Sequence, residues 1–384
     1  RYILLQDRDD AREDTRATEI IKADLRDPIS LEEVARKYGG QIDGVVSIFE
    51  EFVEPAAILT GHLNLPGSSV EAARAATDKQ LMRQKFADAP EKISPEWAEV
   101  KSLDDLLAFA SSHGFPLIMK PANLVKSLLV SKSNSLEELK KNYENTTRTI
   151  DDVYKRYARG RQPKIIVEEF LDGTQHSVAA FATNSGEVVV ADGIADIVTA
   201  SEKGFEDSFL YSRGLPSRLP ADVQKNVRHV AELGVKSLGL RSCPAHVEIM
   251  LTKDGPMIIE IGARIGGYRQ RMYQLASGID LSSAVLDLAL GKQIELNVRK
   301  NEACEAIELF PEKPGRLREI VNLDRLKALP SLAYLSVKHD AGELVGKASG
   351  GFKATAVVIL HSADRSQLQV DAHFIENEVS VEVD

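Results

Sequence analysis

The sequence predicts an α/β fold that becomes α+β in its C-terminal part. Near the N-terminus, short apolar runs typical of strands alternate with segments typical of helices, as in a doubly wound unit. Two apolar runs flank Lys-Asp-Gly-Pro at residues 253–256 and predict a β-hairpin, because Asp-Gly is a strong turn signal. From Ala303 onward, short apolar runs alternate with turns. These patterns and the length of 384 residues predict more than one domain.

The N-terminal elements follow from local signals. Residues 2–5 read as a strand, and Ser-x-x-Glu within residues 30–40 resembles a capping box that opens a helix ending at Gly-Gly. Residues 43–49 are a short apolar run, typical of a strand in a parallel sheet. A helix is expected over residues 53–63.

The central elements follow from periodicity and turn residues. Helices are expected over residues 69–76, 79–86, 103–112, 135–157, 221–238 and 281–290. Strands are expected over residues 115–121, 128–131, 164–171, 176–183 and 187–194. Residues 94–100 read as a connection, and residues 196–219 as a long loop of the kind that often forms a binding loop or lid.

We expect four parts in the chain. These are an N-terminal α/β domain at 1–75, linker helices with a small central domain at 76–175, a larger domain at 176–295, and a β-rich subdomain at 296–384. The chain begins with Arg1 on an apparent strand, so we expect that an N-terminal segment, including the first strand of the first domain, precedes it.

Composition narrows the classes of partner. The net charge of −10 argues against nucleic acid or an anionic membrane as a general partner. Two cysteines form neither a disulfide framework nor a Cys-x-x-Cys metal site, which suits a reducing cytosol. No apolar run approaches the ~20 residues of a membrane span. We therefore expect a cytoplasmic protein with small-molecule partners.

The predicted hairpin carries two carboxylates. If its turn centres near Asp254, Glu248 and Glu260 lie opposite each other on one face. Facing carboxylates repel, and a Mg²⁺ ion between them would remove the conflict, because Mg²⁺ takes one or two carboxylates together with phosphate oxygens and water. The alternative is a surface hairpin with two solvated glutamates.

An anion site is predicted beside this hairpin. Arg264 offers a planar fork for a carboxylate or phosphate, and Gly266-Gly267 allow close approach of the backbone before an expected helix start. Lys79 near a helix start and Lys120 at a strand end are suitable point charges for phosphate. For each lysine considered alone, the simpler interpretation is a solvated surface residue.

Four further residues complete the candidate set. Glu168 and Glu169 end an apolar strand and precede Leu171, so this segment can offer backbone groups to a base and a carboxylate to ribose hydroxyls. His176 lies near them in the chain, although a structural histidine is the simpler interpretation. Neither a P-loop nor a GxGxxG fingerprint is present. The residues therefore indicate a Mg-nucleotide site built from scattered strands, without specifying a reaction.

The order of these motifs resembles the ATP-grasp superfamily. Within it, ATDKQLMRQKF, PLIMKPANLVKSLLV, GLRSCPAHVEIML and IIEIGARIGG resemble the L-amino acid ligases, dipeptide synthetases of the bacilysin type. The resemblance covers about residues 40 to 290. It implies a pre-ATP-grasp domain, a small central lid domain and a C-terminal domain with an antiparallel sheet.

The resemblance also implies roles for individual residues. The phosphate contacts would be Lys79, Lys120 and Ser127; the adenine and ribose contacts Glu168, Glu169 and Leu171, with His176 near the nucleotide; the metal ligands Glu248 and Glu260; and the contacts to the substrate carboxylate and acyl phosphate Arg264 and Gly267. Two positions depart from the family pattern. The phosphate loop around Ser127 is poor in glycine, and Gly262 stands where many relatives have a metal-binding Asn.

The resemblance implies an ATP-dependent carboxylate–amine ligation that proceeds through an acyl phosphate. The metal would be Mg²⁺, or Mn²⁺ in its place, and the substrates would be amino acids. A homodimer is also expected. Two alternatives remain open. One is another ATP-grasp ligase or carboxylase, similar to biotin carboxylase or the purine-pathway enzymes. The other is a nucleotide-binding scaffold that has lost catalysis.

Overall fold

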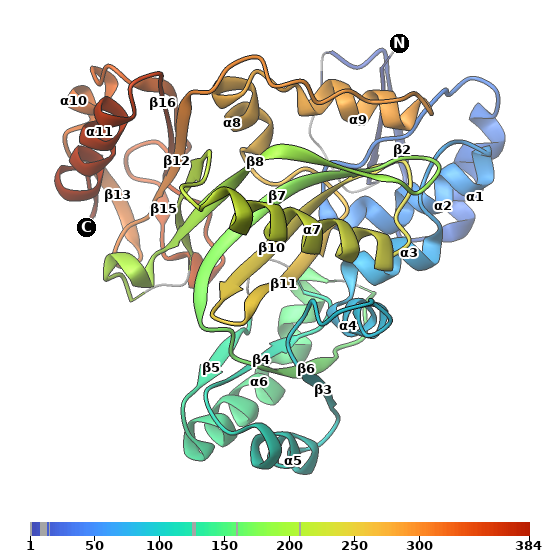
Figure 1. The fold of residues 1–384 in the computed structure, drawn as a ribbon, viewed down its shortest axis with the longest axis horizontal. Helices are drawn as coiled ribbons and strands as arrows, with labels where there is room; N and C mark the ends of the chain where they lie inside the picture. Colours follow the sequence, from blue (N-terminus) through green and yellow to red (C-terminus); the bar gives the residue numbers. More distant parts are fainter. Residues whose placement is uncertain (1, 8–13, 15, 125–127, 159, 207–208) are drawn as a thin grey trace.

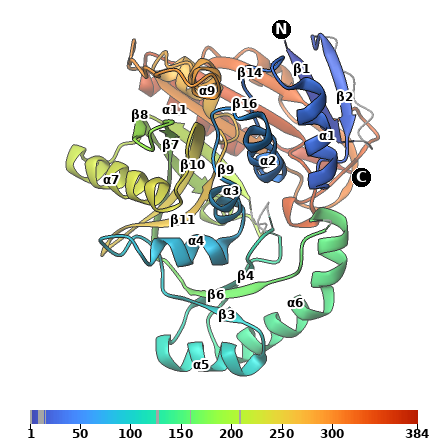
Figure 2. The same cartoon turned by 90° about the vertical axis from the view of Figure 1, so that its right-hand side faces the viewer.

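The computed structural model describes residues 2–7, 14, 16–124, 128–158, 160–206 and 209–384. The described strands form four sheets with two, eight, three and four strands. The eight-stranded sheet lies at the centre of the molecule, and the four-stranded sheet lies below it in Figures 1 and 2. The protein is therefore a mixed α/β fold, as the sequence predicts.

The N-terminal part contains a parallel pair, β1 (Ile3–Asp7) and β2 (Glu19–Ala23). Helix α1 (Pro28–Tyr38) is capped by Asp27, so the predicted cap at Ser30 is wrong. Pro fits the first helical turn, and Ser30 instead accepts a hydrogen bond from the backbone of Asp24.

Two predictions on the next segment have opposite outcomes. Helix α2 (Val53–Leu63) has the predicted bounds. Residues 43–49 form no strand, which corrects the prediction. Val45 and Val46 instead line a small cavity together with Cys243, Pro244 and Val285.

The small domain is built on the four-stranded sheet, in the order β3-β6-β4-β5. Its elements are β3 (Trp97–Val100), α5 (Leu103–His113), β4 (Leu117–Pro121), β5 (Ser131–Ser133), α6 (Leu136–Tyr157) and β6 (Ile165–Glu169). The expected connection over residues 94–100 is wrong in part, because β3 pairs with β6 through Trp97 and Glu168. Only that pairing makes this short segment a strand.

The large sheet is antiparallel throughout, in the order β11-β10-β7-β8-β9-β12-β16-β14. Its strands are β7 (Gly173–Ala182), β8 (Val188–Thr199), β9 (Leu210–Leu215), β10 (Cys243–Thr252), β11 (Gly255–Gly262), β12 (Ala303–Leu309), β14 (Leu332–Val337) and β16 (Ala356–Ser362). The predicted long loop at 196–219 is therefore wrong, because β8 and β9 occupy both of its flanks and pair with each other. Strands after residue 296 extend this sheet, and the four-part division of the chain stays a prediction.

Helices cover both faces of the large sheet. Helix α7 (Ala221–Ser237) covers one face of the sheet (Figure 1), where it packs with Val178 and Ile194. Helices α8 (Arg269–Ala276) and α9 (Leu281–Ala289) pack on the opposite face. The register of β11, β10 and β7 places Glu260, Glu248 and Ser177 on the face of α8.

The other described elements connect or cap these layers. They are α3 (Val70–Thr77), α4 (Lys79–Phe86), β13 (Gly315–Ile320), α10 (Leu323–Lys327), β15 (Leu344–Val345), α11 (Arg365–Glu378), β17 (Val381–Val383) and the short helices Glu50–Phe52, Ser201–Lys203 and Ala348–Gly350. Within the described ranges, no helix has the length and apolar character that a bilayer crossing requires.

Candidate active site

The β10–β11 hairpin brings its two glutamates together. Glu248 lies opposite Glu260, as predicted, but the register near the turn differs from the one on which the prediction was based. Thr252 pairs with Gly255 across a two-residue turn, and this register continues to Ile249 and Ile258. A bulge at Ile259 then shifts the pairing by one residue. Without the bulge, Glu260 would point to the opposite face.

Glu248 is held by neighbours on its own face. His246 Nε2 lies 3.4 Å from Glu248 Oε1, and Gln175 Nε2 donates to Oε2 at 3.4 Å. Burial opposes ionisation, but the hydrogen bond from His246 and the nearby charges of Arg264 and Arg269 outweigh it and hold the pKa of Glu248 at about 2. The carboxylate is therefore ionised at neutral pH, as a metal ligand must be.

His246 is a site residue for which the sequence assigned no role. A side chain at Gly266 would place its Cβ 2.4 Å from His246 Nδ1, so the ring fills the space that the glycine leaves. Gly266 is thus needed for the close approach of the loop to β10. The His-x-Glu spacing on a strand was the available signal, because it puts both side chains on one face.

Lys79 contacts the second glutamate. Its Nζ lies 2.9 Å from Glu260 Oε1 and donates to the carbonyl of Leu124 at 3.1 Å. Asp78 caps α4 by accepting from the backbone N–H groups of Gln80 and Leu81, which fixes the helix start that presents Lys79. The predicted phosphate contact and a predicted metal ligand are therefore neighbours.

Lys120 and Glu168 also meet, inside the small domain. Lys120 Nζ lies 2.6 Å from Glu168 Oε2, and Arg83 Nε donates to Oε1 at 2.9 Å. All three side chains are almost fully buried. Arg83 had no predicted role, because its position in a short amphipathic helix gives no sign of burial.

The other predicted nucleotide contacts have different partners. Glu169 accepts from the backbone of Glu96 at 3.1 Å, and the partly buried Leu171 follows the end of β6. His176 lies on the α7 face with both ring nitrogens engaged, by Thr174 at 2.7 Å and Asp196 at 3.0 Å. Their contacts to a nucleotide stay predictions, as does that of Ser127, which lies outside the described residues.

Arg264 meets a residue from the N-terminal part. Its Nε lies 2.8 Å from Glu50 Oε2. A Cβ at Gly262 would come within 2.6 Å of the same oxygen, so Glu50 occupies the space beside Gly262. Glu50 Oε1 is buried without a hydrogen-bond partner in the described part of the chain. Sequence reasoning missed Glu50, because no local pattern relates residue 50 to residue 264.

A second set of polar side chains lies on the same face of the large sheet as Ser177. Arg213 on β9 contacts Glu308 on β12 at 3.0 Å, and the Tyr268 hydroxyl donates to Glu308 at 2.7 Å. Arg269, which is 3% exposed, donates to Ser177 Oγ at 2.7 Å. Gly267, directly before Tyr268, is exposed with open space at its Cβ position.

The hairpin suits a hard cation that keeps open coordination positions. Glu248 and Glu260 side chains are 28% and 31% exposed, so oxygen atoms from a ligand or water can reach them. The described ranges contain no group of three or more His, Cys, Asp or Glu arranged for a metal. Two carboxylates with external oxygens fit Mg²⁺ in a nucleotide complex rather than a closed structural site.

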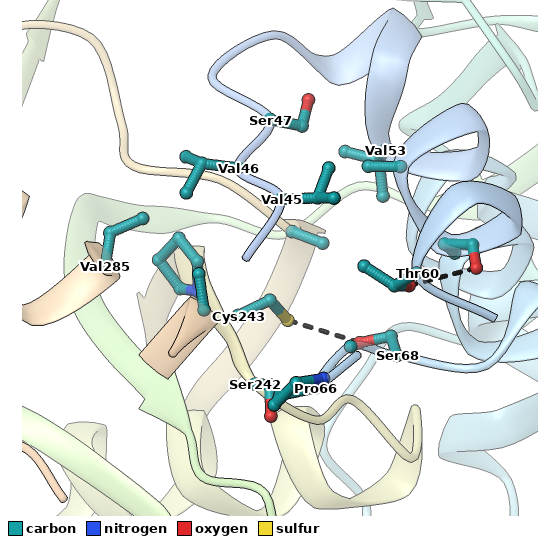
Figure 3. Close-up of a pocket in the computed structure, with 16 residues that line it drawn as sticks. Val45, Val46, Ser47, Val53, Thr60, Pro66, Ser68, Ser242, Cys243 and Val285 are labelled. Carbon is teal, nitrogen blue, oxygen red and sulfur yellow. Dashed lines mark hydrogen bonds between the residues drawn. The ribbon is translucent and has the colours of Figure 1, made fainter. Parts of the chain in front are cut away.

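The cavity in Figure 3 is not the substrate site. Its volume is about 50 Å³, and most of its lining residues are apolar. Its Ser68 and Cys243 side chains contact each other at 3.4 Å (Figure 3). A space of this size holds at most a few water molecules.

Comparisons with known proteins bear on the domain and the fold of this chain. Residues 113–271 match the model of the ATP-grasp domain. The chain is 29% identical over 271 residues to alanine–anticapsin ligase of Bacillus subtilis strain 168, covering 68% of this chain and 57% of the relative. It is 24% identical over 324 residues to the L-arginine-specific L-amino acid ligase of Bacillus subtilis, covering 80% of this chain and 72% of the relative.

A solved structure extends the likeness along the chain. The L-amino acid ligase from Bacillus licheniformis superimposes with a TM-score of 0.82 at 19% identity, covering 100% of this chain and 92% of that one. The chain spans only 57% to 62% of the length of the alanine–anticapsin ligases that it matches. The chain therefore has the ATP-grasp fold and carries an ATP-grasp domain over residues 113–271.

Proposed function

We propose that the protein is an ATP-dependent carboxylate–amine ligase that forms an amide through an acyl phosphate and releases ADP and phosphate. The observation that carries the proposal is the Glu248–Glu260 pair, flanked by Lys79 on one side and Arg264 on the other. This set provides two metal-binding carboxylates, a cation for phosphate and a fork for the acid. The ligase names of the relatives support the same reaction class.

The nucleotide would lie between the two sheets. Lys79 and Lys120 would bind its phosphates, with Ser127 in the intervening loop, and Glu168, Glu169, Leu171 and His176 are proposed around the base and ribose. Mg²⁺, or Mn²⁺ in its place, would neutralise phosphate charge when bound by Glu248 and Glu260. Phosphoryl transfer depends mainly on such positioning and charge neutralisation.

The acid would bind at Arg264. One carboxylate oxygen attacks the γ-phosphorus, so an oxygen–phosphorus bond forms as the bond to ADP breaks. The amine then attacks the acyl carbon, loses a proton, and expels phosphate. Arg264 and the backbone at Gly267 would stabilise the oxyanion of this second step.

Amino acids are the proposed substrates. Arg264 and the adjacent carboxyl group of Glu50 suit the carboxylate and the ammonium group of one amino acid. The Arg213–Glu308–Tyr268 group would then face the substrate side chain. We further propose a cytoplasmic location and a homodimer, without nucleic acid or membrane as partner.

The test is a screen of amino acid pairs for phosphate release with ATP and Mg²⁺, with mass spectrometry of the products. A dipeptide formed in equal amount with phosphate is the expected result. Turnover that requires bicarbonate would instead indicate a carboxylase. Binding of Mg-ATP without phosphate release for any acid and amine would indicate a scaffold that has lost catalysis.

A further inference from the structure

Arg83 occupies an unusual position for a charged residue. It is the largest fully buried side chain among the described residues, with 1% exposure. It lies on α4 one turn after Lys79, so both side chains leave the same face of the helix. Its Nε donates to Glu168 Oε1 at 2.9 Å, and its Nη2 donates to the carbonyl of Ile259 at 2.7 Å.

These two acceptors belong to different sheets. Glu168 lies on β6 of the small domain, where it also binds Lys120. Ile259 lies on β11 of the large sheet. Figures 1 and 2 both show α4 between the two sheets. One guanidinium therefore connects the two halves that would enclose a nucleotide.

The contact at Ile259 has a specific consequence for the hairpin. Ile259 is the extra residue of the bulge, and an extra residue lacks a regular partner in the strand ladder. Arg83 supplies a hydrogen bond to its carbonyl and so stabilises the bulge. The bulge in turn keeps Glu260 opposite Glu248, because a shift by one residue would turn Glu260 to the other face.

The buried charges on the small-domain side are not balanced. Arg83 and Lys120 share the single carboxylate of Glu168, and Arg83 Nη1 has no hydrogen-bond partner within the described ranges. Burial lowers the pKa of Lys120, and the nearby charges of Arg83 and Lys79 lower it further, while Glu168 opposes the change. An anion beside Lys120 would relieve this repulsion.

We propose that Arg83 is a positioning residue that couples an occupied nucleotide site to the register of Glu260. A phosphate bound at Lys120 fixes the Lys120–Glu168–Arg83 chain, and Arg83 then holds the bulge at Ile259. This inference rests on the proposed function, because it takes a nucleotide as the anion. Loss of Arg83 should leave nucleotide binding largely intact but misplace a metal ligand, and should therefore lower kcat more than it raises KM for ATP.

Three variants of the full chain test this coupling. Arg83→Met leaves Lys120 and Glu168 as a balanced pair, so the variant should fold. Arg83→Lys keeps the charge but lacks a fork that reaches two acceptors. Lys85→Met is the matched control, because Lys85 is on the same helix but pairs with Glu71 at the surface. Far-UV circular dichroism checks folding, and Arg83→Lys carries the test if Arg83→Met does not fold.

Each variant is measured with Mg-ADP. Calorimetry gives its affinity, and hydrogen–deuterium exchange gives the protection of peptides covering residues 255–262. We expect Mg-ADP to protect this segment in the wild type and in Lys85→Met. Both Arg83 variants should bind Mg-ADP within about tenfold of the wild type and lose the added protection. With the substrates found by the phosphate-release screen, kcat should fall about 100-fold, as expected for a misplacement of about 1 Å.

The outcomes separate the inference from the proposed function. Retained protection and kcat within about threefold of the wild type in either Arg83 variant would overturn the coupling alone. Loss of Mg-ADP binding with unchanged exchange of residues 255–262 would also overturn it, because Arg83 would then act only within the nucleotide site. Failure of the wild type to bind Mg-ADP would overturn both proposals.

Discussion

Glu50→Gln should change how the stability of the ligand-free protein depends on pH. Burial, together with the nearby charge of Glu260, raises the pKa of Glu50 to about 7 against the opposing effects of Arg264 and Lys79. In the unfolded chain the pKa returns to 4.5. The folded protein therefore binds a proton more tightly than the unfolded chain, and the wild type loses stability as the pH rises from 4.5 through 7.

The magnitude follows from the two pKa values. A tenfold change in proton affinity corresponds to about 1.4 kcal/mol, so the rise from 4.5 to about 7 amounts to about 3 kcal/mol. The glutamine side chain of the Glu50→Gln variant does not ionise, and this loss should be absent from the variant. The free energy of unfolding of Glu50→Gln relative to the wild type should thus increase by about 3 kcal/mol between pH 4.5 and pH 8.

The assay is urea unfolding without metal or nucleotide, followed by circular dichroism at several pH values in this window. Circular dichroism is preferable to fluorescence, because Trp97, the single tryptophan, lies in the small domain. The same change at the exposed Glu51 is the matched control for loss of a carboxylate. A difference between Glu50→Gln and the wild type that stays constant with pH would refute the reasoning.

Three further predictions concern the hairpin and its loop. Glu260→Gln should lower turnover at least about 1000-fold with little change in the urea midpoint, since loss of carboxylate repulsion offsets loss of the Lys79 ion pair; retained turnover would remove the metal assignment. Arg264→Lys should lower kcat/KM for the acid about 100-fold, because lysine lacks the bidentate fork; steady-state phosphate release measures this, and an unchanged value contradicts it. Gly262→Ala should displace Glu50 from Arg264 and raise KM for the acid about tenfold with the fold intact, as kinetics and circular dichroism would show; an unchanged KM would mean that Glu50 does not bind the acid.

Elements with strong local signals were predictable from the sequence. Helix α2 and the hairpin of β10 and β11 follow from periodicity and turn chemistry. The facing of Glu248 and Glu260 was also predicted, although the turn has two residues and the bulge at Ile259 supplies the remaining shift. A bulge leaves little trace in a sequence of alternating apolar residues, so only the structure explains this pairing.

Elements that depend on distant partners were not predictable. Residues 97–100 become a strand because β6 lies beside them, whereas residues 43–49 have strand-like composition but form no strand, and Val45 and Val46 line a cavity instead. Tertiary context overrides local propensity in both cases. The same limit applies to Glu50 and Arg83, since their roles arise from contacts with residues more than 80 positions away along the chain.

The bulge at Ile259 also affects how this chain should be compared with others. Glu248 and Glu260 are twelve positions apart, and two residues at an even spacing can lie opposite each other in a hairpin in two ways. With a three-residue turn and regular strands, the extra residue would lie in the turn. In this protein the extra residue is Ile259, which lies within the strand and accepts a hydrogen bond from Arg83. A relative can therefore keep the spacing of its carboxylates while differing in turn length. Insertions near residues 253–254 alone do not reveal whether the two glutamates still share a face; a side chain that binds the bulge, as Arg83 does here, indicates that the extra residue lies within the strand.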